Sequence, residues 1–358
     1  MSVDDFFDHM KHGHAYISGD LAGADLSGRE LRKLIVIRTG FPGATFAQAK
    51  LTSLTFVECD LQGCDFTDAT FLKCNFVKCD LRGARFDGAT LEASGLVESD
   101  AERASFRGVR AFKVSFMKTS LRDADLQGMS IEKSVIMNCS TEGMDLSGAD
   151  LRNVALTEAD LRTSKLDDLR CDTIMLMEAD LSNRDLRSLV LARANLTGTS
   201  FASANLSGMD LSGGVFKGAN LQRADLTGAK AEMTLFAGAD LSGATLRGAE
   251  LKLANFEGAT LQATDFGGAK LEMAGLNSTV ATAARFDQAD LTLTRFGYAD
   301  LKGAVFSGAR FRQTDLHGAL LDGSLSAGAS GSTLPTDQPR AIAELYDPRH
   351  VAQTDSEG

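Results

Sequence analysis

A five-residue period runs through most of the chain and limits its fold more than any other feature. From Leu21 to Leu321 every fifth residue keeps the same phase without insertion or deletion, and 54 of these 61 positions hold Leu, Phe or Ile. Two residues before each of them lies a second column, in which 51 of 61 residues are Ala, Ser, Thr, Cys, Gly or Val. Self-similarity at a fixed period indicates a repeat architecture.

The period does not fit a long helix, but it fits a strand that turns corners. Five residues rotate the chain of an α-helix by about 140° beyond a full turn, so the apolar residues would spread around the helix surface. In a strand, residues two apart point the same way, so the small and the large column both face inward. The other three residues turn a corner, for which the Asp, Asn, Ser, Thr and Gly found there are suited. We therefore expect an all-β chain that coils around its own core.

Units such as ADLSG, ANLTG and ADLKGAVFSGARF resemble the A-(D/N)-L-x-x repeats of the pentapeptide-repeat family. The resemblance covers roughly residues 20–324 and implies a right-handed quadrilateral parallel β-helix. Four repeats per coil correspond to about 15 coils. On this basis we expect a cap over residues 1–16, the β-helix over 17–324, and a flexible linker and tail over 325–358 in which PRAIAELY forms a short helix.

Four cysteines within ECDLQGCDFTDATFLKCNFVKCDL raise the question of a zinc site. Paired zinc ligands are usually two to four residues apart on turns, whereas these gaps follow the five-residue repeat. The small inward column contains Cys59, Cys64, Cys74, Cys79 and Cys139, and the large inward column contains Cys171. We therefore expect buried thiols that behave as small apolar residues, no metal site and no cofactor.

The sequence gives no indication of catalysis. His317 is the only histidine in the repeat region, and the glycines follow the corner rhythm instead of forming a phosphate loop or a nucleophile elbow. No apolar run approaches the ~20 residues of a membrane span, and the N-terminus lacks the apolar region of a signal peptide. We expect a non-enzymatic cytoplasmic protein that does not enter a membrane, with export by a dedicated secretion system left open.

The net charge of −11 is distributed unevenly around the expected coil. One face carries an acidic ladder that consists of Asp60, Asp80, Asp100, Asp160 and Asp180. Each of these carboxylates can bond to the backbone of its own corner, or the ladder can imitate the regular charge of a DNA duplex. A neighbouring face is mildly basic with acidic residues interleaved, so we do not expect direct binding of nucleic acid.

Another face is apolar on its outer side. In each coil, one outward position of this face comes just after the large residue. In successive coils this position holds apolar residues that include Ile37, Val57, Val77, Val97, Met117, Met137 and Met177. Two columns away lie Ile35, Val135, Met175, Val215 and Leu235, and the neighbouring corner carries Met233, Leu253, Met273 and Leu293. An apolar strip of this length exceeds what the surfaces of monomers usually expose. Unless the ends of the chain cover it, or its β-branched residues merely favour strand formation, we expect this surface to contact a protein partner or a second copy of the chain.

The sequence therefore predicts a scaffold or adaptor protein. Two alternatives stay open because the pentapeptide-repeat family includes several functions. One is a DNA mimic that modulates or protects a type II topoisomerase such as gyrase. The other is an accessory or translocated protein of a bacterial secretion system, because some of the repeat strings look similar to components of type VI systems.

Overall fold

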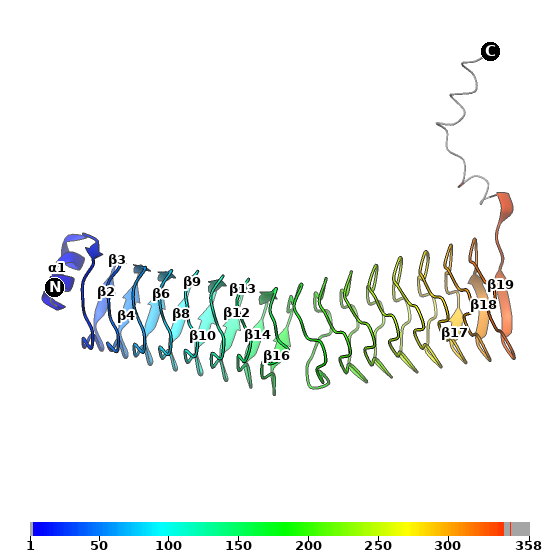
Figure 1. Cartoon of the computed structure of the whole chain (residues 1–358), viewed down its shortest axis with the longest axis horizontal. Coiled ribbons are helices and arrows are strands. Elements are labelled where there is room, and N and C mark those ends of the chain that lie inside the picture. Colours follow the sequence, from blue (N-terminus) through cyan, green and yellow to red (C-terminus); the bar gives the residue numbers. More distant parts are fainter. Residues whose placement is uncertain (1–2, 340–343, 345–358) are drawn as a thin grey trace, which may run out of the picture. The chain divides into compact units, whose positions relative to one another are not determined.

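The computed structural model describes residues 3–339 and 344, which belong to two compact units, Met1–Asn205 (unit 1) and Leu206–Gly358 (unit 2). Both units are built from parallel coils, and the described residues make about 16 turns of β-solenoid with almost no helix. Successive coils of each unit lie side by side in Figure 1. The predicted all-β repeat fold is confirmed, with about 16 turns where about 15 were expected.

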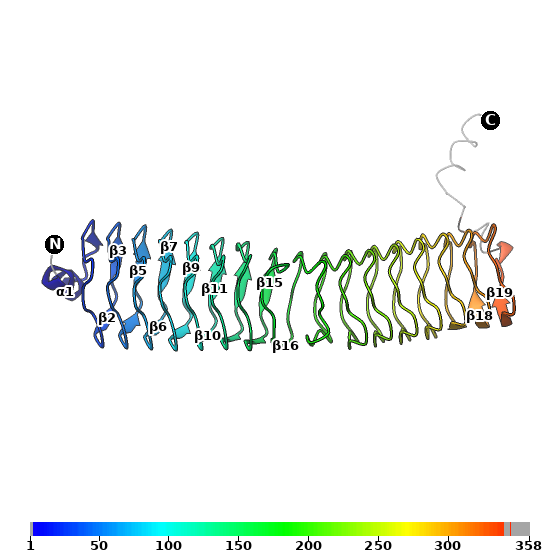
Figure 2. The same ribbon diagram turned by 60° about the horizontal axis from the view of Figure 1, so that its bottom comes forward.

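Unit 1 begins with a helix and continues with short strands. The elements are α1 (Val3–His12), β1 (Tyr16–Ile17), β2 (Glu30–Arg32), β3 (Ile35–Ile37), β4 (Lys50–Thr52), β5 (Thr55–Val57), β6 (Thr70–Leu72), β7 (Asn75–Val77), β8 (Thr90–Glu92), β9 (Gly95–Val97), β10 (Arg110–Phe112), β11 (Ser115–Met117), β12 (Ser130–Glu132), β13 (Val135–Met137), β14 (Asp150–Arg152), β15 (Ala155–Thr157) and β16 (Arg170–Asp172). Strands β1 and the odd-numbered strands to β15 form one eight-stranded sheet, and the even-numbered strands β2 to β16 form another. Figure 2 shows β3, β5, β7, β9 and β11 in sequence along one side.

The strands pair in a register of twenty residues. Val57, for example, pairs with Val77, and Val77 pairs with Val97. Four five-residue repeats therefore complete one coil, and residues twenty apart stack directly on each other. This stacking turns the columns of the sequence into columns on the surface of the molecule.

Unit 2 continues the same repeat, mostly as isolated parallel bridges. Its strands are β17 (Asp290–Thr292), β18 (Arg310–Asp315) and β19 (Ser330–Leu334), which form a three-stranded sheet in that order. The expected flexible linker from residue 325 is wrong for residues 330–334, because β19 pairs with β18. Residues 338–339 are helical, and most of the short helix predicted for the tail lies outside the described residues.

Nearly every corner places one residue in the left-handed backbone conformation. Gly83 (φ 65°) and Gly88 (φ 68°) adopt it readily, whereas Lys73 (φ 56°) and Lys78 (φ 54°) adopt it without the freedom of glycine. The corners are tied to the next coil, as in the hydrogen bond from the N–H of Gly83 to the carbonyl of Glu102 at 3.0 Å. The coil geometry therefore imposes the left-handed conformation on residues of many types, glycine or not.

The large column fills the core with stacked rings. Phe46, Phe66, Phe86 and Phe106 lie on successive coils, with ring centroids 4.9, 4.7 and 4.9 Å apart and ring planes within 23° of parallel. All four side chains have no exposed surface. The column of small residues leaves the room in which these rings pack.

Five of the six cysteines are buried in this core, and Cys171 is half-buried. The Sγ atom of Cys64 donates a hydrogen bond to the carbonyl of Phe41 at 3.0 Å. Burial raises the pKa of the Cys64 thiol to about 12. All six cysteines are free, and five of them are buried thiols as expected, whereas the expectation is wrong for Cys171, which is only half-buried.

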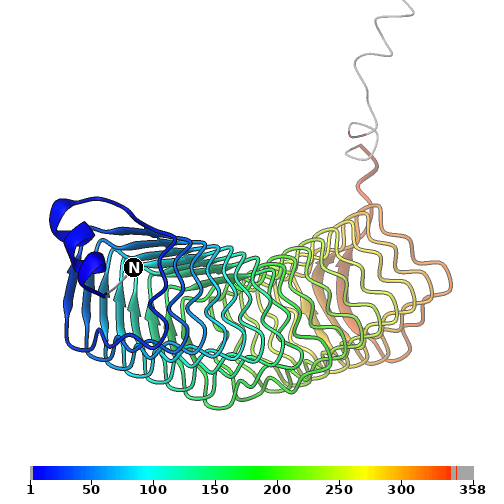
Figure 3. The same ribbon diagram turned by 60° about the vertical axis from the view of Figure 1, so that its left-hand side comes forward.

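Helix α1 lies at the N-terminal end of unit 1. Its acidic residues Asp4 and Asp5 lie in the first turn, where the helix dipole favours negative charge. The Phe6 ring is fully buried, 5.1 Å from the ring of Tyr16 and 6.0 Å from that of Phe41. Since Tyr16 and Phe41 belong to the core, α1 covers the open end of the first coils, beside which it lies in Figure 3.

The histidine of the repeat region, His317, is buried and hydrogen-bonded to other parts of unit 2. His317 is 1% exposed, and its Nδ1 accepts a hydrogen bond from the N–H of Asp337 at 3.2 Å. The Oη atom of Tyr298 lies 2.9 Å from Nε2 of the same ring. His317 thus fastens the segment that follows β19 to the coils of unit 2.

Candidate protein-interaction surface

The outer side of the sheet β1–β15 carries a continuous line of apolar residues. We call this line the apolar stripe, and it consists of Ile37, Val57, Val77, Val97, Met117 and Met137, the third residues of β3, β5, β7, β9, β11 and β13. Strand register pairs each of them with the next. The structure therefore brings these six predicted residues together in a line of about 24 Å, at ~4.8 Å per strand.

The stripe residues are half-buried, and strand register stacks each of them on the next. Beside the stripe, Ile35, Val135 and Met175 are more exposed, with 51%, 36% and 36% of their surface accessible. Met177, expected in the same line, is half-buried, and its Sδ atom lies 3.6 Å from Nδ2 of Asn195. The apolar surface of unit 1 is thus widest at the two ends of the stripe.

The remaining predicted interface residues belong to unit 2. Val215 and Leu235 are half-buried and pair with each other across one coil step. A second group, which we call the corner column, consists of Met233, Leu253, Met273 and Leu293. Their exposed fractions are 63%, 44%, 45% and 41%, so they are more exposed than the stripe. The predicted interface residues are therefore divided between unit 1, which holds the stripe, and unit 2, which holds Val215, Leu235 and the corner column.

The aspartates in the first part of the acidic ladder form hydrogen bonds and ion pairs within the chain. Asp60, Asp80 and Asp100 stack on successive coils, and the Oδ1 atom of each accepts the backbone N–H of the second residue after it, at 3.0–3.2 Å. Between two of these carboxylates lies Arg82, with Nη2 2.5 Å from Asp80 Oδ2 and Nε 3.8 Å from Asp100 Oδ2. The negative charge is therefore partly neutralised.

Asp160 and Asp180 repeat this arrangement further along the chain. The guanidinium of Arg162 lies between them, 2.6 Å from the Oδ2 atom of Asp160 and 3.3 Å from that of Asp180. The hydrogen bond from Arg162 lowers the pKa of the Asp160 carboxyl below its ordinary value. These contacts match the local interpretation of the ladder, in which the aspartates stabilise the corners.

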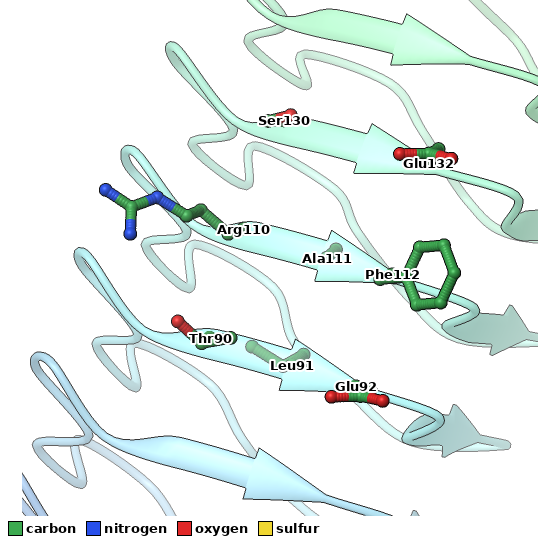
Figure 4. Close-up of a pocket in the computed structure, with 8 residues that line it drawn as sticks. All are labelled: Thr90, Leu91, Glu92, Arg110, Ala111, Phe112, Ser130 and Glu132. Atoms are coloured by element: carbon green, nitrogen blue, oxygen red, sulfur yellow. The ribbon is translucent and has the colours of Figure 1, made fainter.

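A shallow depression lies on the other eight-stranded sheet (Figure 4). Its volume is about 260 Å³, and it surrounds Ala111, which stands in the large column where Leu, Phe or Ile is usual. The neighbouring Phe112 ring has the Nζ atoms of Lys113 and Lys133 at 5.1 and 5.4 Å from its centroid. Sequence reasoning missed this depression, although the alanine in the large column was a visible signal.

Two features are absent from the described part of the chain, a metal-ligand cluster and a helix able to span a membrane. Within residues 3–339 and 344, no group of three or more His, Cys, Asp or Glu side chains is placed to hold a metal ion. Over the same residues, no helix combines the length and the apolar character that crossing a bilayer requires.

Comparison with known proteins shows that the repeats of this chain match a known repeat family. The chain matches the family model for pentapeptide repeats in eight copies, over 37–68, 56–92, 138–169, 176–213, 199–232, 234–272 and 284–323. No curated protein matches the sequence.

Solved structures with a similar arrangement include two pentapeptide-repeat proteins. QnrB1, a plasmid-mediated fluoroquinolone resistance protein, is 19% identical over 52% of this chain and 92% of its own, with a TM-score of 0.34. HetL, which is involved in the regulation of heterocyst differentiation in the cyanobacterium Nostoc sp. strain PCC 7120, is 21% identical over 81% of this chain and 96% of its own, with a TM-score of 0.22. Because the family model matches more than half of the 358 residues, the chain belongs to the pentapeptide-repeat family.

Proposed function

We propose that this protein is a non-enzymatic scaffold or adaptor that binds a protein partner through the apolar stripe of unit 1. The observation that carries the proposal is the unbroken stacking of six apolar residues on the outer side of one sheet. The outward positions of a coil do not fill the core, so the fold does not require apolar side chains there. An apolar line of this length instead favours contact with apolar side chains of another protein.

The position of the N-terminal cap supports this proposal. Helix α1 is the segment of unit 1 that could have covered the stripe, but its buried Phe6 packs on the core residues Tyr16 and Phe41. The residues of the stripe also suit a partner surface, because valine gives a flat apolar surface and Met117 and Met137 can adapt their side chains to a partner.

The topoisomerase-protecting alternative has less support. A DNA mimic needs an uncompensated line of negative charge, whereas Arg82 and Arg162 each lie between two aspartates of the ladder. The secretion-system alternative depends on the repeat motif alone, which all members of the family share. We therefore retain the protein-binding scaffold as the proposed function.

Site-specific photo-crosslinking in the living host tests the proposal. A photoreactive benzoylphenylalanine at Met117 is expected to form covalent adducts with a partner, because that position lies within the stripe. The same residue at Phe112, the third residue of β10 on the other sheet, is the matched control and is expected to form none. Adducts of equal yield from both positions, or from neither, would contradict the proposal.

A further inference from the structure

The corner column of unit 2 combines two unfavourable features. Met233, Leu253, Met273 and Leu293 have left-handed backbone conformations, with φ of 55°, 60°, 61° and 57°. Among the described non-glycine residues with positive φ, they are the only aliphatic side chains larger than alanine. Their side chains are also exposed, by 41–63%. The left-handed backbone of these residues and the exposure of their apolar side chains both raise the free energy of the isolated chain. This column therefore indicates a surface that another molecule covers.

Beside the corner column, the charges alternate in sign over six coils. This charge column reads Asp210, Lys230, Glu250, Lys270, Asp290 and Arg310. The residues stack by parallel pairing in steps of twenty. Within the chain, Lys270 Nζ lies 3.0 Å from Glu250 Oε1, and Arg310 Nη1 lies 3.4 Å from Asp290 Oδ2. The column has no net charge, so it does not attract a polyanion or a strongly charged protein.

The alternation is antisymmetric about its midpoint, which lies between Glu250 and Lys270. If a second copy lies antiparallel across the column with a two-fold axis at that midpoint, every facing pair has opposite signs. Glu250 of each copy then faces Lys270 of the other. In the same way, the pair Lys230 and Asp290 and the pair Asp210 and Arg310 face each other.

The neighbouring columns fit the same axis. Between the charge column and the corner column, Lys252 of one copy faces Glu272 of the other. In the corner column, Met233 faces Leu293 and Leu253 faces Met273, so the apolar residues cover each other. A shift of the axis by half a coil step would set Glu250 against Asp290, and like charges at close distance repel. A shift by a whole coil step keeps opposite signs but forms fewer facing pairs, so the register centred between Glu250 and Lys270 gives the most complementary contact.

We propose that unit 2 is a self-association surface, on which two copies of the chain pack antiparallel through the corner column and the charge column. This surface consists of residues other than those of the apolar stripe, so the inference does not depend on the function proposed for unit 1. The contact is narrow, which places the association in the class of weak, reversible interfaces.

Sedimentation equilibrium of the full chain over about 10–200 µM tests the inference. The wild-type chain is expected to approach twice its monomer mass at the upper end of this range. Glu250→Lys sets two like-charged pairs across the axis and is expected to raise the dissociation constant at least about tenfold. A wild-type chain that stays monomeric throughout would overturn the proposal.

Two double variants of identical composition separate the association from effects within one chain. Glu250→Lys with Lys270→Glu exchanges two residues that face each other, so opposite signs across the axis return and the dissociation constant is expected within about threefold of wild type. Lys230→Glu with Glu250→Lys creates the same number of like-signed neighbours within the chain but sets like charges across the axis. It is expected to remain at least about tenfold weaker. Equal behaviour of the two variants would refute the antiparallel register.

A third variant tests the apolar part of the contact. Leu253→Gly with Met273→Gly keeps the left-handed corners, which glycine adopts without strain, and removes the two side chains nearest the axis. The thermal midpoint is expected to stay at or above that of wild type, while the dissociation constant rises at least about tenfold. Unchanged association would contradict the role of the corner column.

Discussion

Replacing Phe66 by alanine is expected to lower the free energy of unfolding by about 3–5 kcal/mol. The Phe66 side chain has no exposed surface, and its ring stacks 4.9 Å from that of Phe46 and 4.7 Å from that of Phe86. The coil cannot close around the resulting cavity, because the N–H of Phe66 is bonded to the carbonyl of Arg85 at 2.7 Å in the next coil. The loss of stability therefore lies at the upper end of the range for single core substitutions.

Urea unfolding followed by far-ultraviolet circular dichroism measures this loss. Thr70→Ala is the matched control, because Thr70 lies four residues further on but points outward and is exposed. We expect Thr70→Ala to change the free energy of unfolding by less than about 0.5 kcal/mol. A loss below about 1 kcal/mol for Phe66→Ala would show that the ring is not part of a tightly packed core.

The triple substitution Val77→Lys, Val97→Lys and Met117→Lys is expected to weaken partner binding at least about 100-fold. These residues stack on β7, β9 and β11, so three ammonium groups would lie about 4.8 Å apart in the middle of an apolar contact. Binding would then have to bury charges without partners. The fold is expected to persist because the side chains point outward, and retention of the partner on immobilised chain measures the effect.

A second triple variant separates loss of the stripe from added charge. Thr52→Lys, Leu72→Lys and Phe112→Lys add the same charge at the third residues of β4, β6 and β10 on the other sheet. This variant is expected to retain the partner as wild type does. If both variants lose the partner equally, net charge determines binding and the stripe has no specific role.

The sequence determines the interior of this protein almost completely. Because side chains alternate along a strand, a period of five with apolar residues two apart allows few other folds. The phase alone correctly placed Cys64 and Phe66 in the core, and it correctly predicted the stacking of Val77 on Val97.

Lateral contacts on the surface could not be predicted in the same way. The period says which residues share a column, but not that Arg82 reaches the aspartates of two coils, since that depends on side-chain rotamers. Strand β19 was missed because SGSTL has no large inward residue, and its pairing with β18 shifts register between Arg312 and Thr314. The strain at Leu253 and Met273 was visible only as apolar residues at corners where glycine is common.

Hydroxyl-radical footprinting of the chain with its captured partner tests the central claim most directly, because methionine oxidation reports on solvent access. Met117 and Met137 lie in the stripe, and the exposed Met233 and Met273 of unit 2 serve as internal references below the concentration of self-association. We predict that partner binding lowers the oxidation of Met117 and Met137 at least about fivefold and leaves Met233 and Met273 unchanged. Equal oxidation of Met117 and Met137 in the free and the bound chain would contradict the proposal that the stripe binds the partner.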